Sequence, residues 1–437
     1  TSTPDIGADE FTTNAFDASV IYVRSPANAV VTPGSPYTIV ITVRNNGSAA
    51  ITTLDANYSV NNGAATSQTF TVGAGLPVGG IQACDTLQLT FTVPFTFGAG
   101  GNNVFRAFTG NVNTNADLVN SNDTLVANFC TPFSGVFTIN KNLPQTQTNF
   151  TSVQSAVNAV YSCGVVGPVT LRIEAGSGPY NEQVLFSGIV PGSSATNTVR
   201  LTGNTTRETI TWLPIASNQQ HTIRLQSAKH ILLDSLTINN TGASFGIGVH
   251  ITATSDSNYV QNSNVNISLV STGFSNSAGI AIASNAASAT GTGNNGNKNV
   301  ISNNAIVGGY YGLTAFGTNT TTFCQNNQFL NNTFNGQAYY GMYLSFQNLV
   351  SINENIVDNI LSTNVSSMGM RFEYVERFEI KKNKINRAGN YGMYFNFANY
   401  QLGSGIDKSE ISNNMIGGIF YSTNPYGINI TSGGCRN

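Results

Sequence analysis

Carboxyl groups are few in the larger part of the chain, although chemistry on a polymeric substrate would need them. From residue 131 onward the sequence has four aspartates: Asp234, Asp256, Asp358 and Asp407. Hydrolysis of a glycosidic bond needs two carboxyl groups roughly 5 to 10 Å apart, and a Ca²⁺ site needs several carboxylate oxygens. Asp256 lies in the polar stretch TSDSN, typical of an Asx turn, and Asp358 and Asp407 flank turns. We therefore predict no catalytic residue among them.

One acidic cluster occurs, with Glu373, Glu376 and Glu379 in the segment RFEYVERFEIKKNKINR at 371–387. The chain has 18 basic and 20 acidic residues, and nine of these charged residues lie in this one segment. Basic side chains such as Arg371 alternate with the glutamates. Opposite charges that alternate along a strand favour a solvated ladder of salt bridges over a binding site.

The three histidines, His221, His230 and His250, are separated by 9 and 20 residues. They have no cysteine or carboxylate partner at the spacing of a zinc site. The glycine-rich stretch GAGG at 98–101 lacks the Lys-Ser/Thr and the helix of a phosphate-binding loop, so a hairpin is the better interpretation. We predict no metal and no cofactor.

Charge is scarce in the whole chain of 437 residues, of which 9% are charged and 40% hydrophobic. Soluble domains are about 25% charged. A formal net charge of -2 excludes the basic surface of a nucleic-acid-binding protein. The sequence has neither a lysine-rich run for an anionic membrane nor the ~18 consecutive apolar residues of a membrane-spanning helix. We therefore expect no nucleic-acid partner and no membrane insertion.

A short motif recurs in the second half of the chain: an apolar residue, two residues, a residue of asparagine type, one residue and a second apolar residue. The asparagine-type position is occupied by Ser263 in one copy. In the other copies it is occupied by Asp234, Asn304, Asn327, Asn355, Asn383 and Asn414. Successive copies are 23 to 41 residues apart. Asp234 is therefore better explained as a turn residue than as a catalytic acid.

A second motif lies between these copies, where a glycine precedes a strand with alternating apolar residues. In four of its copies a tyrosine comes directly before the glycine: Tyr311, Tyr340, Tyr391 and Tyr426. These tyrosines are the candidates for stacking on sugar rings, because an exposed row of aromatic rings can bind sugars. The aromatic residues at alternate positions after each glycine are better explained as core.

The repeat predicts a right-handed parallel β-helix of about three short strands per coil. A period of 23 residues without a helical pattern is too short for a strand-helix-strand unit of about 30 residues. Each motif asparagine should then lie above its counterpart, in a left-handed turn, with its amide hydrogen-bonded along the stack. The longer periods predict loops on the flank, such as 284–299.

Residues 16–130 have the pattern of an immunoglobulin-like β-sandwich, with short alternating strands between Gly, Asn and Pro turn signals. In the strand at 86–95, Leu87, Leu89, Phe91 and Val93 share the face expected to be buried.

A single convincing helix follows at about 151–162, with Thr151 and Gln154 as a capping box and Gly164 at its end. It should cover the first edge of the β-helix. The predicted fold class is all-β, with an immunoglobulin-like β-sandwich at 16–130 and, at 131–437, a right-handed parallel β-helix with an N-terminal capping helix. Residues 1–15 are interpreted as the tail of a preceding repeat unit or a linker, and we expect the β-helix to continue beyond residue 437.

The chain resembles the pectate-lyase-like or pectin-esterase-like β-helix of secreted Bacteroidota proteins in the blocks SGVFTI (134–139), FTSVQSAVNAVYSCGVVGPVTLRI (150–173), GPYNEQVLF (178–186), VRLTGN (199–204) and HILLDSLTINN (230–240). This resemblance covers about 131–437. Residues 16–130 resemble bacterial adhesion-related immunoglobulin-like domains, and PDIGADEF near the start is similar to the segment that closes a β-helix in such proteins. The resemblance implies a large cell-surface protein exported by the type IX pathway.

Pectin-esterase catalysis requires two aspartates with an arginine and a glutamine on adjacent coils. The scattered aspartates of this chain do not supply such a set, so the resemblance implies the fold and not the activity. We expect a non-catalytic structural or adhesive segment of a repetitive extracellular surface protein or filament. Its expected partners are the neighbouring repeat units and possible surface polysaccharides. The alternatives are a β-helix lyase, esterase or hydrolase whose carboxylates gather in space, and a carbohydrate-binding module.

The five cysteines are Cys84, Cys130, Cys163, Cys324 and Cys435. Cys130 ends the sandwich segment and Cys163 ends the helix, so the two bracket the junction between the predicted domains. A disulfide between them would stabilise the fold by about 3 kcal/mol through loop closure. Cys324 occupies an apolar position of the repeat and is expected to be a free core thiol.

We predict that mass spectrometry of non-reduced peptides links Cys130 to Cys163. A peptide that joins Cys84 to Cys130 would contradict this pairing.

Overall fold

A computed structural model describes residues 14–117, 119–268, 276–284, 287–360, 366–399, 409–420 and 425–431. The chain divides into two compact units between Phe133 and Ser134. The boundary predicted from the sequence lies between residues 130 and 131. Each unit is described by itself below. Most of the predicted tail at 1–15, and also Asp407 and Cys435, lie outside the described residues.

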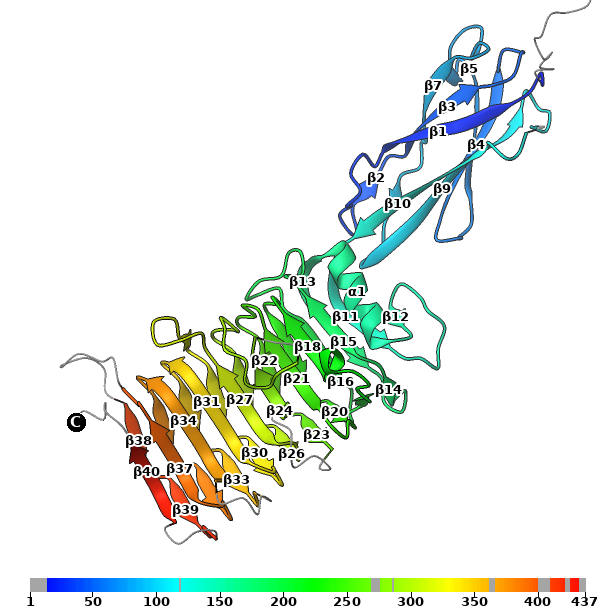
Figure 1. Ribbon diagram of the computed structural model, residues 1–437. Coiled ribbons are helices and arrows are strands. Elements are labelled where there is room, and N and C mark those ends of the chain that lie inside the picture. Colours follow the sequence, from blue (N-terminus) through cyan, green and yellow to red (C-terminus); the bar gives the residue numbers. More distant parts are fainter. Residues whose placement is uncertain are drawn as a thin grey trace, which may run out of the picture. The chain divides into compact units, whose positions relative to one another are not determined.

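The first unit is a β-sandwich of two sheets (Figure 1). One sheet has the strand order β1-β3-β7, all antiparallel, with bounds Ala18–Ser25, Val40–Asn45 and Thr86–Thr90. The other has the order β10-β9-β4-β5-β6, with bounds Thr124–Thr131, Gly101–Val112, Thr53–Val60, Thr66–Val72 and Gly75–Leu76. A short antiparallel pair joins β2 (Pro36–Tyr37) and β8 (Phe95–Thr96).

Aromatic side chains fill the core of this sandwich. The ring of Tyr58 meets that of Phe91 edge-on at 4.9 Å and stacks on Phe105 at 5.6 Å. Leu89 and Phe91 are buried, as predicted, but Val93 is 58% exposed. The prediction for Val93 was wrong because β7 ends at Thr90, and its alternation of inward and outward side chains ends with it.

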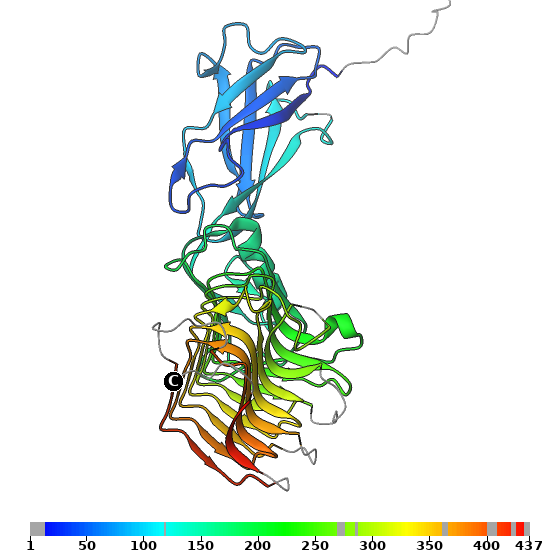
Figure 2. The same cartoon turned by 60° about the vertical axis from the view of Figure 1, so that its left-hand side comes forward.

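The second unit is a right-handed parallel β-helix with three sheets (Figure 2), so the predicted fold class is confirmed. Sheet 1 has the order β12-β11-β13-β16-β19-β22-β25-β29-β32-β35-β38, with bounds Asn149–Phe150, Phe133–Ile139, Val165–Ile173, Val199–Gly203, Ile231–Asp234, Tyr259–Gln261, Val300–Ser302, Gln328–Leu330, Ser351–Asn353, Glu379–Lys381 and Glu410–Ser412.

Sheet 2 has the order β14-β17-β20-β23-β26-β30-β33-β36-β39, with bounds Tyr180–Asn181, Thr209–Trp212, Thr237–Asn240, Asn264–Ile267, Ala305–Val307, Thr333–Asn335, Ile356–Asp358, Lys384–Asn386 and Met415–Gly417. Sheet 3 has the order β15-β18-β21-β24-β27-β31-β34-β37-β40, with bounds Val184–Ser187, His221–Gln226, Gly246–Thr252, Ser277–Ile282, Tyr311–Phe316, Tyr340–Asn348, Met368–Glu376, Tyr391–Asn396 and Tyr426–Thr431; β28 (Cys324–Gln325) also pairs with β31.

From β13 onward, each coil of the described β-helix contributes one strand to each sheet, and successive coils pair in parallel. The middle residue of the short strands points inward, so that Val260 lies between Leu233 and Ile301 in the register of sheet 1. All three are fully buried. The apolar residues of the repeat therefore build one continuous core along the stack.

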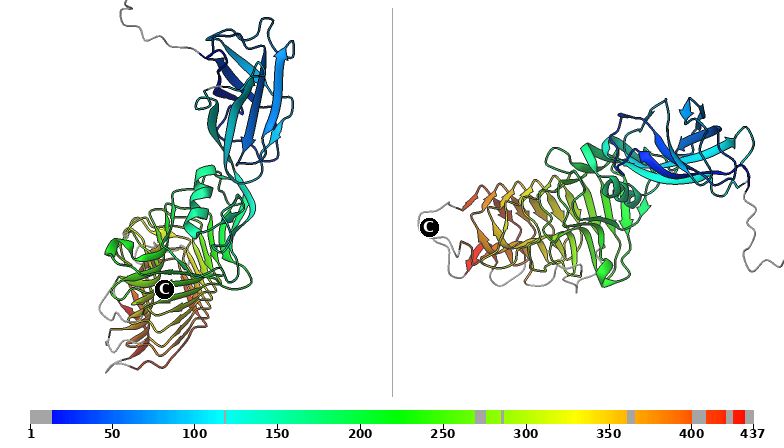
Figure 3. Two further views of the ribbon diagram at one scale, coloured as in Figure 1. Left: turned by 90° about the vertical axis from the view of Figure 1, so that its right-hand side faces the viewer. Right: turned by 90° about the horizontal axis from the view of Figure 1, so that it is seen from above.

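The helix α1 (Val153–Cys163) lies against β13 and β15 of the first coil (Figures 1 and 3). The N-cap is Ser152, whose hydroxyl accepts from the amide of Ser155 at 3.1 Å, and not Thr151 as predicted. The carboxylate of Glu182, in the first coil, accepts the first-turn amide of Val153 at 2.8 Å. A negative charge at a helix N-terminus is favourable, so this contact holds the helix α1 against the first coil. The described residues contain no helix that is long and apolar enough to span a membrane.

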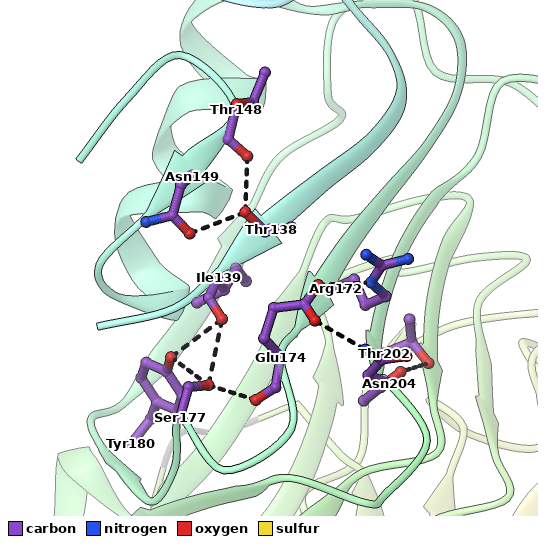
Figure 4. A network of polar contacts seen from close by, with 11 residues as sticks. Thr138, Ile139, Thr148, Asn149, Arg172, Glu174, Ser177, Tyr180, Thr202 and Asn204 are labelled. Atoms are coloured by element: carbon purple, nitrogen blue, oxygen red, sulfur yellow. Dashed lines mark hydrogen bonds and ion pairs between the residues drawn. The ribbon is translucent and has the colours of Figure 1, made fainter. Parts of the chain in front are cut away.

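A polar network joins β11 to the first two coils (Figure 4). The hydroxyl of Tyr180 donates to the carbonyl of Ile139 at 3.2 Å and contacts the hydroxyl of Ser177 at 2.9 Å. The carboxylate of Glu174 accepts from the Asn204 amide of the next coil at 2.8 Å. These contacts satisfy polar groups at the first edge of the stack.

Two of the five cysteines, Cys130 and Cys163, are disulfide-bonded. Cys84 is exposed and free, and Cys324 is buried and free. The pairing of Cys130 with Cys163 remains a prediction.

Three aspartates of the sandwich, Asp17, Asp117 and Asp123, are at most 8% exposed. Asp117 accepts from the amide of Ala18 at 2.8 Å, and Asp17 from the side chain of Asn122 at 3.0 Å. Burial, together with the charges of Asp117 and Asp17, raises the pKa of Asp123 to about 6. A carboxyl group whose pKa is higher in the folded chain favours folding at low pH.

We predict that the sandwich is more stable at pH 5 than at pH 8. The contribution of Asp123 is fully present below the pKa of an unfolded aspartate, about 3.9, and is lost as the pH rises through about 6. Hydrogen exchange of the β9 amides at several pH values measures this dependence. The substitution Asp123→Asn should flatten it, and an unchanged pH dependence in that variant would refute the assignment.

Candidate functional site

From the coil of β19 onward, the first corner of a coil is the two-residue turn that connects a strand of sheet 1 to a strand of sheet 2. Its first residue has a left-handed backbone, with φ of 57° at Asn303, 55° at Asn331 and 56° at Asn413. Its second residue points inward, and Asn304 and Asn332 are at most 2% exposed. Each such corner thus consists of one strained, outward residue followed by one buried asparagine.

The buried asparagines form a ladder along this corner. The Oδ1 of Asn332 accepts from the backbone amide of Asn304 at 3.1 Å, and the Oδ1 of Asn355 accepts from that of Asn332 at 3.0 Å. Further steps join Asn355 to Asn383 and Asn383 to Asn414, each at 2.9 Å. Each Nδ2 also donates to a carbonyl, such as that of Phe329 for Asn355 at 2.8 Å. One side chain therefore satisfies both a donor and an acceptor of the preceding coil.

The structure corrects two members of the predicted ladder. Asp234 is the last residue of β19, and the ladder position of that coil is occupied by Leu236, whose amide donates to the Ser263 hydroxyl at 3.1 Å. The carboxylate of Asp234 instead pairs with Arg200 and accepts from Asn262 at 2.9 Å. The second misplaced residue is Asn327. The left-handed residue is also not the ladder asparagine itself but the residue before it.

Asn327 belongs to a second ladder, at the corner that connects sheet 3 to sheet 1. The Oδ1 of Asn299 accepts from the amide of Asn258 at 3.1 Å, and the Oδ1 of Asn327 accepts from that of Asn299 at 2.9 Å. All three side chains are completely buried. The sequence contained the signal, because each of these asparagines stands two residues before an inward apolar residue of sheet 1, as the first ladder does in sheet 2.

A polar groove lies over this second corner. Its floor includes the left-handed residues that precede the ladder, with φ of 59° at Ser257, 57° at Lys298 and 57° at Asn326. Two adjoining hollows of about 510 and 360 Å³ make up the groove. Their lining residues are Lys229, His230, Asp256, Ser257, Asn294, Asn297, Lys298, Thr321, Thr322, Phe323, Gln325, Asn326, Asn348, Glu376 and Arg377. Asp256, His230 and Glu376 are the residues of this set that were weighed as functional candidates from the sequence.

Two opposite charges in the groove pair with each other. The ammonium of Lys229 lies 3.0 Å from the carboxylate of Asp256, which also accepts from the amide of Asn297 at 2.9 Å. The guanidinium of Arg377 donates to Asn348 at 2.9 Å. The carboxyl group of Asp256 is thus held as a structural acceptor.

The acidic cluster at 371–387 does not gather in space, because the segment passes through β34, β35 and β36, one strand in each sheet. Glu373 lies on sheet 3 and Glu379 on sheet 1, where Glu379 pairs with Lys381. Asp358, at the end of β33, pairs with Arg387 at 2.8 Å. Among the described residues, no three His, Cys, Asp or Glu side chains are arranged as metal ligands.

The candidate tyrosines line sheet 3, and they differ in exposure. Tyr311 is 5% and Tyr340 2% exposed, so their rings cannot stack on a sugar. Both pack with Tyr343, and the Tyr340 hydroxyl accepts from Arg371 at 2.7 Å. The prediction failed for these two because the outer face of sheet 3 carries its own layer of aromatic side chains.

Tyr391 and Tyr426 remain accessible in part. Tyr391 is half-buried, and Tyr426 is 47% exposed. Their rings stack on each other with centroids 5.7 Å apart, in neighbouring coils. They remain candidates for a sugar contact.

Two of the histidines also lie on sheet 3. Burial lowers the pKa of His221 to about 3 and that of His250 to about 4. The Nε2 of His250 donates to the carbonyl of Ala283 at 2.9 Å, so the side chain serves as a neutral core group. His230 stands apart from them, in the groove.

The chain matches no protein-family model, and no curated protein is similar to it in sequence. Solved structures that this chain matches include two enzymes and an adhesin. An alginate lyase from Paenibacillus sp. is 13% identical over 62% of this chain and 97% of its own, with a TM-score of 0.38. The surface protein and adhesin PfbA of Streptococcus pneumoniae is 11% identical over 64% and 94%, with a TM-score of 0.35. A family 28 exopolygalacturonase from Yersinia enterocolitica is 9% identical over 97% and 100%, with a TM-score of 0.25.

We predict that Asn355→Ala destabilises the β-helix by about 2 to 4 kcal/mol. The substitution leaves the amide of Asn332 and the carbonyl of Phe329 without partners, and each buried orphan costs about 1 to 3 kcal/mol. Denaturant unfolding measures the change. The matched control is Asn335→Ala, an exposed residue at the end of β30, which should stay within about 0.5 kcal/mol of the wild type. Equal effects of the two substitutions would contradict the role of the ladder.

Proposed function

We propose that this chain is a non-catalytic, adhesive segment of an extracellular surface protein. The proposal rests on one observation: the carboxyl groups in the groove over the second corner are either paired or buried. Asp256 is fixed by Lys229 and Asn297, and Glu376 is 3% exposed. A glycosidase or a lyase of this architecture would need carboxyl groups or a cation aligned along an open face.

The surface of the β-helix also favours attachment. Most residues at its two corners are asparagine or serine, with charged residues such as Lys298, Glu354 and Lys382 at some outward positions, and the buried amide ladders fix each coil to the next. A rod built from coils that contact mainly their neighbours can present a long, preformed surface to a polymer.

The parent protein is part of the proposal. The resemblance of 16–130 to adhesion-related immunoglobulin-like domains, and of 131–437 to β-helices of secreted Bacteroidota proteins, supports a cell-surface location. It also supports export by the type IX pathway and a parent made of repeated modules that are joined into a filament. The neighbouring repeat units would then be partners of this segment, together with a surface polysaccharide.

Two measurements on the full chain test the proposal. Incubation with polygalacturonate, alginate and xylan should release neither reducing ends nor unsaturated uronate products, because the groove holds no free pair of carboxyl groups. Beads coated with the chain should be retained under flow on a surface coated with bacterial capsular or cell-wall polysaccharide, whereas albumin-coated beads should not. Cleavage of any of these polymers, or retention no better than that of albumin, would overturn the proposal.

A further inference from the structure

The two hollows over the second corner form one continuous groove. They share Thr322 and Phe323, which precede β28, and Gln325, which belongs to β28. The first hollow extends from these residues toward His230, and the second toward Arg377.

The groove runs along the stack of coils. Its corner residues precede six successive strands of sheet 1, from β19, which follows His230, to β35, which follows Arg377. Because adjacent strands are about 4.8 Å apart, the groove spans about 24 Å. This length fits several units of an extended polymer and exceeds any single small molecule of ordinary size.

The lining matches a polymer rich in hydroxyl groups. Gln325 and Thr322 are exposed, and amide side chains offer both a donor and an acceptor, as a sugar hydroxyl does. Phe323 is half-buried at the junction of the two hollows and gives an apolar surface for the face of a sugar ring. The lining has three basic residues, Lys229, Lys298 and Arg377, and two acidic ones, Asp256 and Glu376. Its formal charge is therefore close to zero, at +1, and Lys229 pairs with Asp256 at 3.0 Å, so the lining does not require a strongly charged ligand.

The floor is also rigid before a ligand arrives. The corner residues Ser257, Lys298 and Asn326 are each followed in the sequence by a ladder asparagine: Asn258, Asn299 and Asn327. The hydrogen bonds of these asparagines fix the spacing of the coils. A site that needs no ordering on binding loses less of its interaction energy to entropy.

We propose that this groove binds a linear, uncharged polysaccharide that lies parallel to the stack of coils. The inference rests on the adhesive function proposed above and names the surface and the class of ligand. The exposed part of sheet 3, with Tyr391 and Tyr426, is then a different surface that this ligand does not need.

Isothermal titration calorimetry of the full chain with soluble oligosaccharides tests the groove. The probes are cellohexaose, mannohexaose and chitohexaose, the matching disaccharides, and hexagalacturonate as the charged counterpart. At least one neutral hexasaccharide should bind at least about tenfold more tightly than its disaccharide, because the longer chain contacts more coils. Tighter binding of hexagalacturonate than of every neutral probe, or no binding of any neutral probe, would overturn the proposed ligand class.

Paired variants locate the site. The double substitution Phe323→Ala and Gln325→Ala should weaken binding of that hexasaccharide at least about tenfold. Asn335→Ala, at an exposed position of β30 on sheet 2 that lines neither hollow, is the matched control and should leave the affinity unchanged. Tyr426→Ala tests the competing surface on sheet 3. Thermal unfolding of each variant shows whether it folds, and Gln325→Ala alone, which removes an exposed side chain, provides a second test if the double variant is unstable. Loss of binding in Tyr426→Ala but not in the groove variants would place the site on sheet 3.

The bead assay separates this inference from the adhesive function. If beads that carry the groove variants are retained as well as wild-type beads, the segment is adhesive but the groove is not its binding site. If wild-type beads are not retained, the adhesive function itself fails.

Discussion

The hydrogen bond between an asparagine carbonyl oxygen and the backbone amide of the preceding coil is the interaction on which the β-helix depends. A two-residue corner turns the chain so sharply that its backbone amide cannot pair within its own coil. The asparagine of the next coil accepts it, as Asn355 does for Asn332, while its own Nδ2 satisfies a carbonyl such as that of Phe329. Because this contact is buried, water could not replace it, and its loss would leave a donor and an acceptor without hydrogen-bond partners. It therefore fixes the register of neighbouring coils.

The scarcity of charge in this chain follows from that constraint. Corner positions that would carry Lys or Glu on an ordinary globular surface alternate here between left-handed residues and buried amides. Left-handed positions still tolerate charge where the side chain reaches solvent, as at Lys298 and Lys382. The inward positions do not, since a buried charge without a partner is costly. An uncharged composition is thus a property of the architecture and carries no information about catalysis by itself.

A coiled chain also separates residues that are close in sequence and joins residues that are far apart. The segment 371–387 contains many charges, yet its three strands face three different directions. The groove, in contrast, collects Asp256, Asn297 and Gln325 from successive coils, and a chain of hydrogen bonds connects them. Function on such a scaffold belongs to rows of residues about one period apart rather than to local motifs.

The sequence by itself determined the period, the β-helix, the helix at its first edge and most of the first ladder, because each of these depends on local spacing of apolar residues and asparagines. It could not assign Asn327, since both corners of a coil share the same spacing of an asparagine two residues before an inward apolar residue, and only the tertiary structure decided which corner it occupies. Nor could it show that Asp234 ends a strand and that Leu236 occupies the ladder position of that coil. The tertiary structure likewise decided that Tyr311 and Tyr340 are buried while Phe323 lines a groove, because exposure depends on which loops and neighbouring coils cover a strand, and that is set by contacts many residues away.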